Sequence, residues 1–275
     1  MPDIKKIQKI LKKNGFGNIT VSEMLGGVRL TGELSSYEDI LECGRLAVDK
    51  KNSRGVINDI KLTGFTPKPM RVPPVNDLAY DGRRPDVLIV GGGIVGSAIA
   101  RELSKYDISV MLCEKEYDLA VAQSSRNDGM IHAGIDLKPN SIKVKYNMRG
   151  NKLYNTLSKE LDVPISKVGQ YVLFTSPWQK LVYPFVVARA RKNDIPIRYV
   201  KQKELDAKVP GLKFRHGGMF FAGAGIVCPY LMTVALAECA VKNGAEVCLN
   251  TAVLDIEREG DRIVSVTTNR GRIYP

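Results

Sequence analysis

Apolar and polar positions along the N-terminal 65 residues alternate between helical and strand-like spacing. The apolar residues of positions 4–11 recur at helical intervals, and the short segments NITVSEM and GVRLTGEL then have strand character. A serine-initiated helix is predicted over YEDILECGRLAVDKK, closed by Gly55, before VINDIKLTG returns to strand spacing. The predicted order is therefore helix, strand, strand, helix, strand over residues 1–65.

Proline spacing marks the next boundary. Residues 66–85 hold Pro67, Pro69, Pro73 and Pro74, and each proline interrupts helices and central strands. We interpret this segment as a semi-rigid linker between two domains.

A new pattern begins at residue 86, where the continuous apolar run DVLIV leads into Gly91-x-Gly93-x-x-Gly96 and then a helical stretch. A strand, a glycine-rich turn and a helix in this order are typical of dinucleotide-binding folds. Gly91 allows the tight turn, Gly93 leaves room for a pyrophosphate, and Gly96 lets the helix pack closely on the strand. The next strand, ISVMLCE, ends in Glu114, whose carboxylate suits the ribose hydroxyls and disfavours a 2′-phosphate.

Composition narrows the class of protein without changing this picture. The chain has 275 residues, of which 44% are hydrophobic and 25% charged, as in soluble globular proteins. The formal charge of +12 favours anionic ligands, but the basic residues are scattered and form no nucleic-acid-binding motif. Five cysteines without a C-x-x-C pair indicate reduced thiols, and we predict a cytoplasmic chain with no metal site and no nucleic-acid partner.

The N-terminal segment GGVRLTGELSSYEDILECGRLAVDKKNSRGVINDIKLTG resembles a BON domain, a small α/β module associated with phospholipid or membrane surfaces. This resemblance implies contact with the inner face of a membrane. Docking or oligomerisation is the alternative role for such a module.

The fingerprint alone does not choose between FAD and NAD. The segment AQSSRNDGMIHAGID, which follows Glu114, resembles the flavin-binding segment of the D-amino-acid-oxidase-like superfamily. This resemblance implies FAD as the cofactor, with Ser124 and Ser125 near its pyrophosphate. It also implies a glutathione-reductase-type Rossmann domain with an inserted α+β substrate domain, over about residues 165–225.

The longer stretches SSRNDGMIHAGIDLKPNSIKVKYNMRGN and GIVCPYLMTVALAECAVKNGAEVCLNTAVLDIE are similar to FAD-dependent glycerol-3-phosphate dehydrogenases. L-2-hydroxyglutarate oxidases share the H-x-G-I and GIV-x-P patterns and remain the alternative. The resemblance implies that His132 takes a hydroxyl proton while hydride leaves the substrate carbon, and that backbone atoms of Val253 hold the adenine. His216, the other histidine, matches no motif and is interpreted as structural.

The implied reaction converts sn-glycerol 3-phosphate to dihydroxyacetone phosphate and passes the electrons to a quinone, an iron–sulfur subunit or oxygen. Lys138, Lys143 and Lys145 are close to His132 in sequence and are interpreted as solvated. The resembled family continues beyond Pro275, so we expect residues 86–275 to be an incomplete oxidoreductase domain. A non-catalytic membrane adaptor that retains a flavin fold is the alternative of another class.

Overall fold

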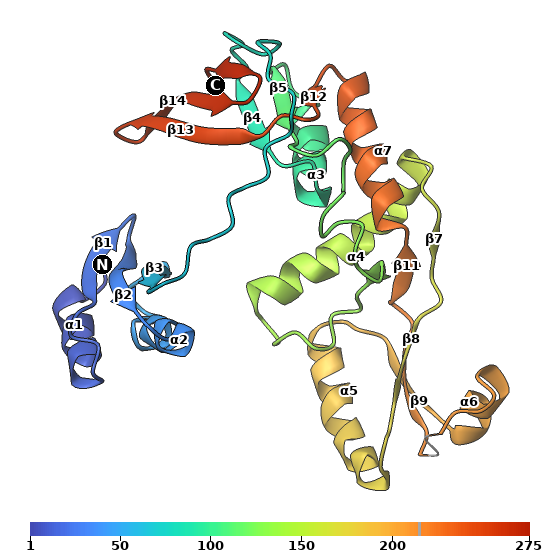
Figure 1. Ribbon diagram of the computed structural model, residues 1–275. Helices are drawn as coiled ribbons and strands as arrows, with labels where there is room; N and C mark the ends of the chain where they lie inside the picture. The colour runs from blue at the N-terminus through green and yellow to red at the C-terminus, as the bar shows by residue number, and fades with distance from the viewer. Residues whose placement is uncertain (214–215) are drawn as a thin grey trace. The chain divides into compact units, whose positions relative to one another are not determined.

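A computed structural model describes residues 1–213 and 216–275 (Figure 1). The chain divides into two compact units, Met1–Arg71 and Val72–Pro275, each described below by itself. In the described residues, no helix combines the length and the apolar character needed to span a bilayer.

Unit 1 follows the predicted order of elements. Its elements are α1 (Ile4–Lys13), β1 (Thr20–Met24), β2 (Gly27–Leu34), α2 (Tyr37–Leu46) and β3 (Val56–Leu62). The strands form one sheet in the order β1-β2-β3, with β1 antiparallel and β3 parallel to β2. Ile7 and Leu11, one helical turn apart, are buried against Val28 and Leu30 of the sheet in the core of this unit.

Helix α2 ends at Leu46, well before Gly55, where the sequence pattern predicted its end. The Asp49 carboxylate accepts hydrogen bonds from the backbone N–H groups of Lys51 and Asn52 at 3.1 and 3.2 Å. These local bonds satisfy the backbone in a turn and compete with further helix formation. The hydrogen bond from the Asn52 side chain lowers the pKa of Asp49, so the charged form that accepts these bonds is favoured.

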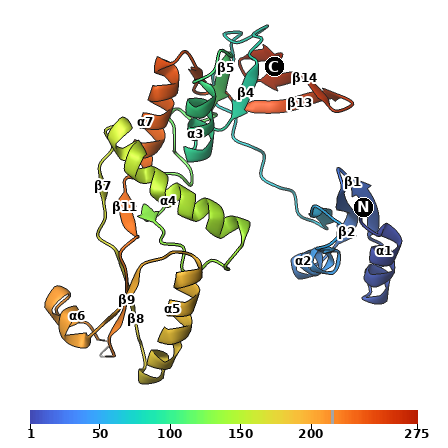
Figure 2. The same cartoon turned by 180° about the vertical axis from the view of Figure 1, so that it is seen from behind.

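Unit 2 is built on a parallel sheet in the order β12-β5-β4. Its strands and the two neighbouring helices are β4 (Val87–Val90), β5 (Val110–Cys113), β12 (Glu246–Cys248), α3 (Ile94–Leu103) and α7 (Pro229–Lys242). All four residues of the central strand β5 are buried, as expected for a parallel strand covered on both faces. Ala100 of α3 and Ala237 and Ala240 of α7 are buried in the core cluster that includes Ile89, and the two helices lie side by side (Figures 1 and 2).

Three further sheets complete unit 2, with strand orders β6-β11-β7, β8-β10-β9 and β13-β14-β15. Their strands are β6 (Met130–Ile131), β7 (Ile165–Ser166), β8 (Gln170–Leu173), β9 (Ile197–Val200), β10 (Gly218–Phe221), β11 (Gly225–Val227), β13 (Val253–Glu259), β14 (Arg262–Thr268) and β15 (Gly271–Ile273). The accompanying helices are α4 (Ile142–Glu160), the 3₁₀-helix η1 (Pro177–Val182), α5 (Tyr183–Lys192) and α6 (Gln202–Lys208). All five cysteines are free, as predicted, and Cys43, Cys113 and Cys248 are buried.

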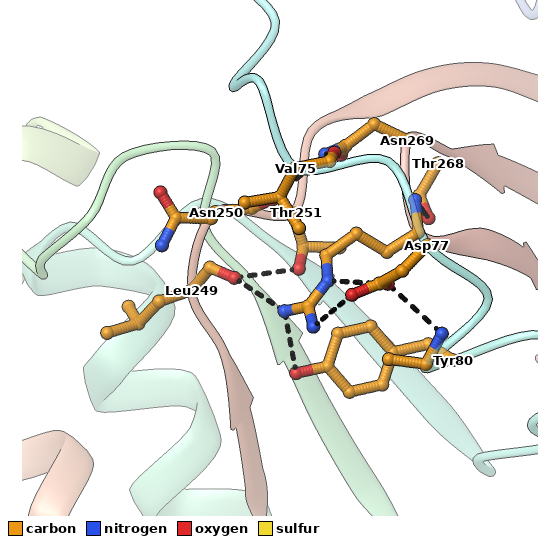
Figure 3. A network of polar contacts seen from close by, with 10 residues as sticks. Val75, Asp77, Tyr80, Leu249, Asn250, Thr251, Thr268 and Asn269 are labelled. Carbon is orange, nitrogen blue, oxygen red and sulfur yellow. Dashed lines mark hydrogen bonds and ion pairs between the residues drawn. The ribbon is translucent and has the colours of Figure 1, made fainter.

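The second half of the proline-containing segment is bonded to unit 2. Arg270, beyond β14, makes a two-pronged contact with the Asp77 carboxylate at 3.0 Å, and its backbone carbonyl accepts from the Tyr80 N–H. The Asn269 side chain donates to the carbonyls of Val75 and Asn250 (Figure 3). Residues 75–82 therefore form part of the fold of unit 2, and the prediction of a linker over the whole of residues 66–85 is wrong for them, because the prolines before them and their own polar residues gave a linker-like pattern.

Candidate functional site

The glycine-rich turn between β4 and α3 has the geometry that its sequence predicts. Gly91 has φ +104°, a left-handed conformation that glycine adopts without strain. A Cβ at Gly96 would lie 2.0 Å from the Gly91 carbonyl oxygen, so no other residue fits there. A Cβ at Gly93 would lie 3.0 Å from Ser124 Oγ. The turn thus brings the backbone close to the N-terminus of α3, the positive end of a helix that is suited to bind phosphates.

Glu114 lies directly after β5, beside this turn. Its Oε2 accepts from the Gly92 N–H at 2.6 Å, and its Oε1 accepts from the Glu116 N–H at 2.9 Å. The position follows from topology, because β4 and β5 are parallel neighbours whose carboxyl ends meet at one edge. A carboxylate fixed there can bind a ribose, while the neighbouring helix N-terminus binds the pyrophosphate attached to it.

Ser124 belongs to a later segment of the chain and also lies at the N-terminus of α3. Its Oγ accepts from the Ile94 N–H, in the first turn of α3, at 2.9 Å. Asn127 holds this segment by donating to the carbonyls of Gln123 and Ser124, at 2.9 and 3.1 Å. Ser125 is exposed. The sequence analysis missed Asn127, although it lies within the motif SSRNDGMIHAG, because no spacing rule distinguishes a loop-holding asparagine from a solvated one.

His132 directly follows β6, and its side chain is exposed. Asn151 of α4 donates to the His132 carbonyl at 2.9 Å and to the Gly223 carbonyl at 2.8 Å. Asn151 therefore fixes the backbone that carries the imidazole and leaves the ring free. Sequence reasoning missed this role also, because the two acceptors are backbone atoms far away in the chain.

Val253 is the first residue of β13, and the turn before it lies against Glu114. The Thr251 N–H donates to the Glu114 carbonyl at 2.8 Å, and the Asn250 N–H donates to the Glu116 carbonyl at 3.0 Å. These contacts bring the Val253 turn to the carboxylate edge of the parallel sheet.

Direct contacts thus join the glycine turn, Glu114 and Ser124. No described contact links these residues to the side chains of Ser125, His132 or His216, or to the exposed Lys138, Lys143 and Lys145.

FAD fits the residues present at this site. The turn offers a backbone cradle that a Cβ at Gly96 or Gly93 would obstruct, and the Glu114 carboxylate lies beside it. The donors for a diphosphate and the acceptor for a ribose therefore occupy one edge of one sheet.

Fold and site together define a dinucleotide-binding domain, and the chain belongs to the FAD dependent oxidoreductase family, whose profile matches residues 86–274. Glycerol 3-phosphate dehydrogenase of Caloramator mitchellensis is 38% identical over 184 residues, covering 66% of this chain and 38% of that protein. L-2-hydroxyglutarate dehydrogenase of Escherichia coli K12 is 28% identical over 191 residues, 69% of this chain and 45% of that protein.

Among solved structures, the L-alpha-glycerophosphate oxidase of Mycoplasma pneumoniae with FAD bound superposes with a TM-score of 0.62 at 30% identity. The match covers 70% of this chain and 52% of that one. Glycine oxidase of Geobacillus kaustophilus has a TM-score of 0.64 at 27% identity, over 70% of this chain and 53% of that one. The chain spans 38% to 49% of the first three curated relatives.

Proposed function

We propose that the protein containing this chain is an FAD-dependent oxidoreductase that oxidises the secondary alcohol of a small anionic substrate, sn-glycerol 3-phosphate, to dihydroxyacetone phosphate. One observation carries the proposal: the glycine turn, the Glu114 carboxylate and Ser124 converge on the N-terminus of α3. The glycerol 3-phosphate dehydrogenase relative, at 38% identity, supports the choice of substrate.

Different residues of the chain would have different roles in this reaction. In the first turn of α3, the N–H groups after that of Ile94, which donates to Ser124, would bind the diphosphate, and Glu114 would accept hydrogen bonds from the ribose hydroxyls. FAD, when bound, supplies the acceptor for the hydride. A neutral His132 imidazole would take the proton of the substrate hydroxyl, so that a C–H and an O–H bond are replaced by a C=O bond. Asn151 would act as a positioning residue through the His132 backbone.

L-2-hydroxyglutarate is the second candidate substrate. It is also an anionic secondary alcohol, and the dehydrogenases that act on it match over 69% of this chain in Escherichia coli. The two substrates differ in the group recognised, a phosphate in one and carboxylates in the other. The same hydroxyl oxidation would serve both, with electrons passing to a quinone, an iron–sulfur partner or oxygen.

The experiment is an absorption spectrum of the purified chain after loading with FAD and desalting, followed by anaerobic addition of each substrate. Retained flavin bands that bleach with glycerol 3-phosphate, and not with L-2-hydroxyglutarate, support the first substrate. The reverse selectivity supports the second. A colourless eluate would remove the FAD assignment for this chain and favour the non-catalytic adaptor.

The two histidines provide matched variants for the catalytic step. We expect His132→Gln to retain FAD but to bleach at least about 100-fold more slowly, the scale of general-base catalysis. His216→Gln, a change of the same type at the other histidine, should leave the bleaching rate unchanged. Equal rates in the two variants would contradict the role of His132.

For unit 1 we propose, on its resemblance to BON domains, contact with a membrane surface at the cytoplasmic face. An open groove on this unit supports a ligand-binding role, since Tyr37, Ile40, Leu41 and Phe65 are among its lining residues. Sedimentation of the chain with liposomes, with and without bound FAD, tests this contact. Sedimentation without any flavin uptake would favour the adaptor function.

A further inference from the structure

The two edges of the sheet in unit 1 differ in how they are protected. Strands β1 and β3 are its outer strands (Figure 1). At the β1 edge, the Gln8 amide of α1 donates to the Ile19 carbonyl at 2.8 Å and accepts from the Val21 N–H at 3.0 Å. In the part of the chain that the structure describes, no other element closes the β3 edge in this way. An edge strand that is left open can pair with another chain.

The direction of the backbone groups along β3 follows from its bonds to β2. The Val28 N–H donates to the Gly55 carbonyl at 2.9 Å, and the Thr63 N–H donates to the Leu34 carbonyl at 2.8 Å. The strands are parallel, and backbone groups point alternately to the two sides of a strand. Odd-numbered residues of β3 therefore bond to β2, and the even-numbered residues point away from it.

The outward-pointing groups of β3 have few partners among the described residues. The Ile60 N–H has only the Asn58 Oδ1, at 3.5 Å, which is too long for a good hydrogen bond. The Leu62 carbonyl accepts from the Phe65 N–H at 3.1 Å and keeps a second lone pair. The edge thus offers donors and acceptors at every second residue, which is the pattern that an added strand requires.

Charged side chains alternate with these backbone groups. Ile60 is buried in the core that α1 and α2 cover, so its neighbours Asp59 and Lys61 lie on the opposite, open face of the sheet. The Arg29 Nε donates to the Asp59 Oδ2 at 2.6 Å, which leaves the Oδ1 of this carboxylate available. Lys61 is exposed and forms no ion pair within the described ranges. The edge therefore carries an anion and a cation two residues apart.

This spacing is complementary to itself in one register. When two β3 strands pair antiparallel with Ile60 opposite Ile60, Asn58 lies opposite Leu62, and all of these are outward-pointing residues. Asp59 then lies opposite Lys61 at a non-hydrogen-bonded pair, where side chains are closest, and the symmetry repeats the pair. A register centred on Asp59 opposes two carboxylates, and one centred on Lys61 opposes two ammonium groups. No other register of the outward-pointing groups pairs Asp59 with Lys61.

We propose that the β3 edge is the interface of a homodimer, in which a second copy of this chain pairs its β3 antiparallel about a two-fold axis at Ile60. The two sheets of unit 1 then form one continuous sheet. Tyr37 and Leu41, which line the groove beside this edge, become covered by the second copy. A membrane would compete for the groove, so the test is made without lipid and does not depend on the contact proposed above or on FAD.

The test is sedimentation velocity of the intact chain over a range of concentrations. We expect a monomer–dimer equilibrium, and we expect Lys61→Asp and Asp59→Lys each to raise the dimer dissociation constant at least 10-fold, since like charges then oppose each other twice. An equimolar mixture of the two variants should dimerise again, because every carboxylate of one chain then faces an ammonium group of the other. Circular dichroism verifies that each variant is folded.

Matched controls reverse the same charges elsewhere on unit 1. Lys9→Asp and Glu23→Lys, at exposed positions of α1 and β1, should leave the dissociation constant unchanged. Hydrogen exchange gives a second readout, because the amides of Asn58, Ile60 and Leu62 should exchange more slowly as the concentration rises. A chain that stays monomeric, a dimer that both reversals at β3 leave intact, or dimerisation without slower exchange at these amides would overturn the proposal.

Discussion

Gly96 has no space for even one additional carbon, because the Gly91 carbonyl oxygen occupies the position that a Cβ would take. The conflict is with backbone, which cannot rotate away as a flexible side chain can. The close approach of α3 to the preceding turn therefore depends on this residue. Glu114 and Ser124 accept hydrogen bonds from backbone N–H groups of this turn and of the start of α3.

We expect Gly96→Ala to lower the free energy of unfolding by at least about 1–3 kcal/mol, as overpacking does, and to abolish retention of FAD. Urea unfolding followed by circular dichroism, with the absorption of the desalted sample, measures both effects. Gly150→Ala is the control, because a Cβ at this position in α4 meets nothing within 4 Å. The control should be neutral or stabilising by about 0.5–1 kcal/mol, since alanine favours helices.

A Glu114→Gln variant tests the role of this single carboxylate. The carboxylate accepts two backbone N–H bonds, and an amide nitrogen cannot accept either of them. We expect FAD affinity to fall about 10-fold or more in a fluorescence titration. Glu116→Gln, two residues further on, changes the same charge beside the site. If both variants lost affinity equally, the effect would be one of general charge and not of ribose recognition.

At the scale of elements, the segment 75–82 shows how separate parts of the chain complete unit 2. Asp77 and Arg270 form a charge-assisted pair, and this hydrogen bond lowers the pKa of the Asp77 carboxyl. Because the pKa is lower in the folded state, the contribution to stability is present above the ordinary pKa of aspartate. It is lost as the pH falls through the lowered value.

We therefore expect the stability of unit 2 to decline below about pH 4, and to do so less steeply in Asp77→Asn. Thermal unfolding between pH 2.5 and pH 6 measures the slope. Asp261→Asn, at a side chain that is 99% exposed, is the control and should retain the slope of the original protein. An unchanged slope in Asp77→Asn would show that the Arg270 pair does not govern acid stability.

The same elements show what the sequence could predict. The order of elements in unit 1 and the strand, turn and helix around Gly91 follow from apolar spacing and glycine positions, which act over a few residues. The end of α2 and the attachment of residues 75–82 do not follow from such spacing. They depend on particular hydrogen bonds, made by the Asp49 carboxylate in one case and by the Asn269 side chain in the other. For the site, Glu114 could be anticipated from the strand before it, whereas Asn151 contacts two distant carbonyls.

At the scale of the whole molecule, each unit has its own buried core. Ile7, Leu11 and Val28 belong to one cluster of unit 1, and Ala100, Leu112 and Ala237 to another in unit 2. Between the cores, residues 66–70 are exposed and have no regular secondary structure. Exposed irregular backbone is the preferred site of proteolysis.

We expect brief trypsin treatment to cut first after Arg71, which is exposed, has no regular secondary structure and is followed by Val72, and to leave two folded fragments. Mass spectrometry identifies the cut, and circular dichroism of the separated fragments measures their folding. Arg71→Gln should slow this first cleavage, while Lys143→Gln, at an exposed lysine of unit 2, should not. Rapid degradation of either fragment would contradict independent folding of the units.

The contacts of Asn269 and Arg270 also have a consequence for biosynthesis. Asp77 and Tyr80 leave the ribosome long before their partner Arg270, which lies 193 and 190 residues later in the chain. Throughout that interval β4 and α3 can already pair and pack with β5, but the segment before β4 must wait. Contacts between residues so far apart in the sequence form slowly. Docking of residues 75–82 should therefore be among the last steps of folding. Chaperones that bind exposed chain would find this segment available throughout translation of unit 2.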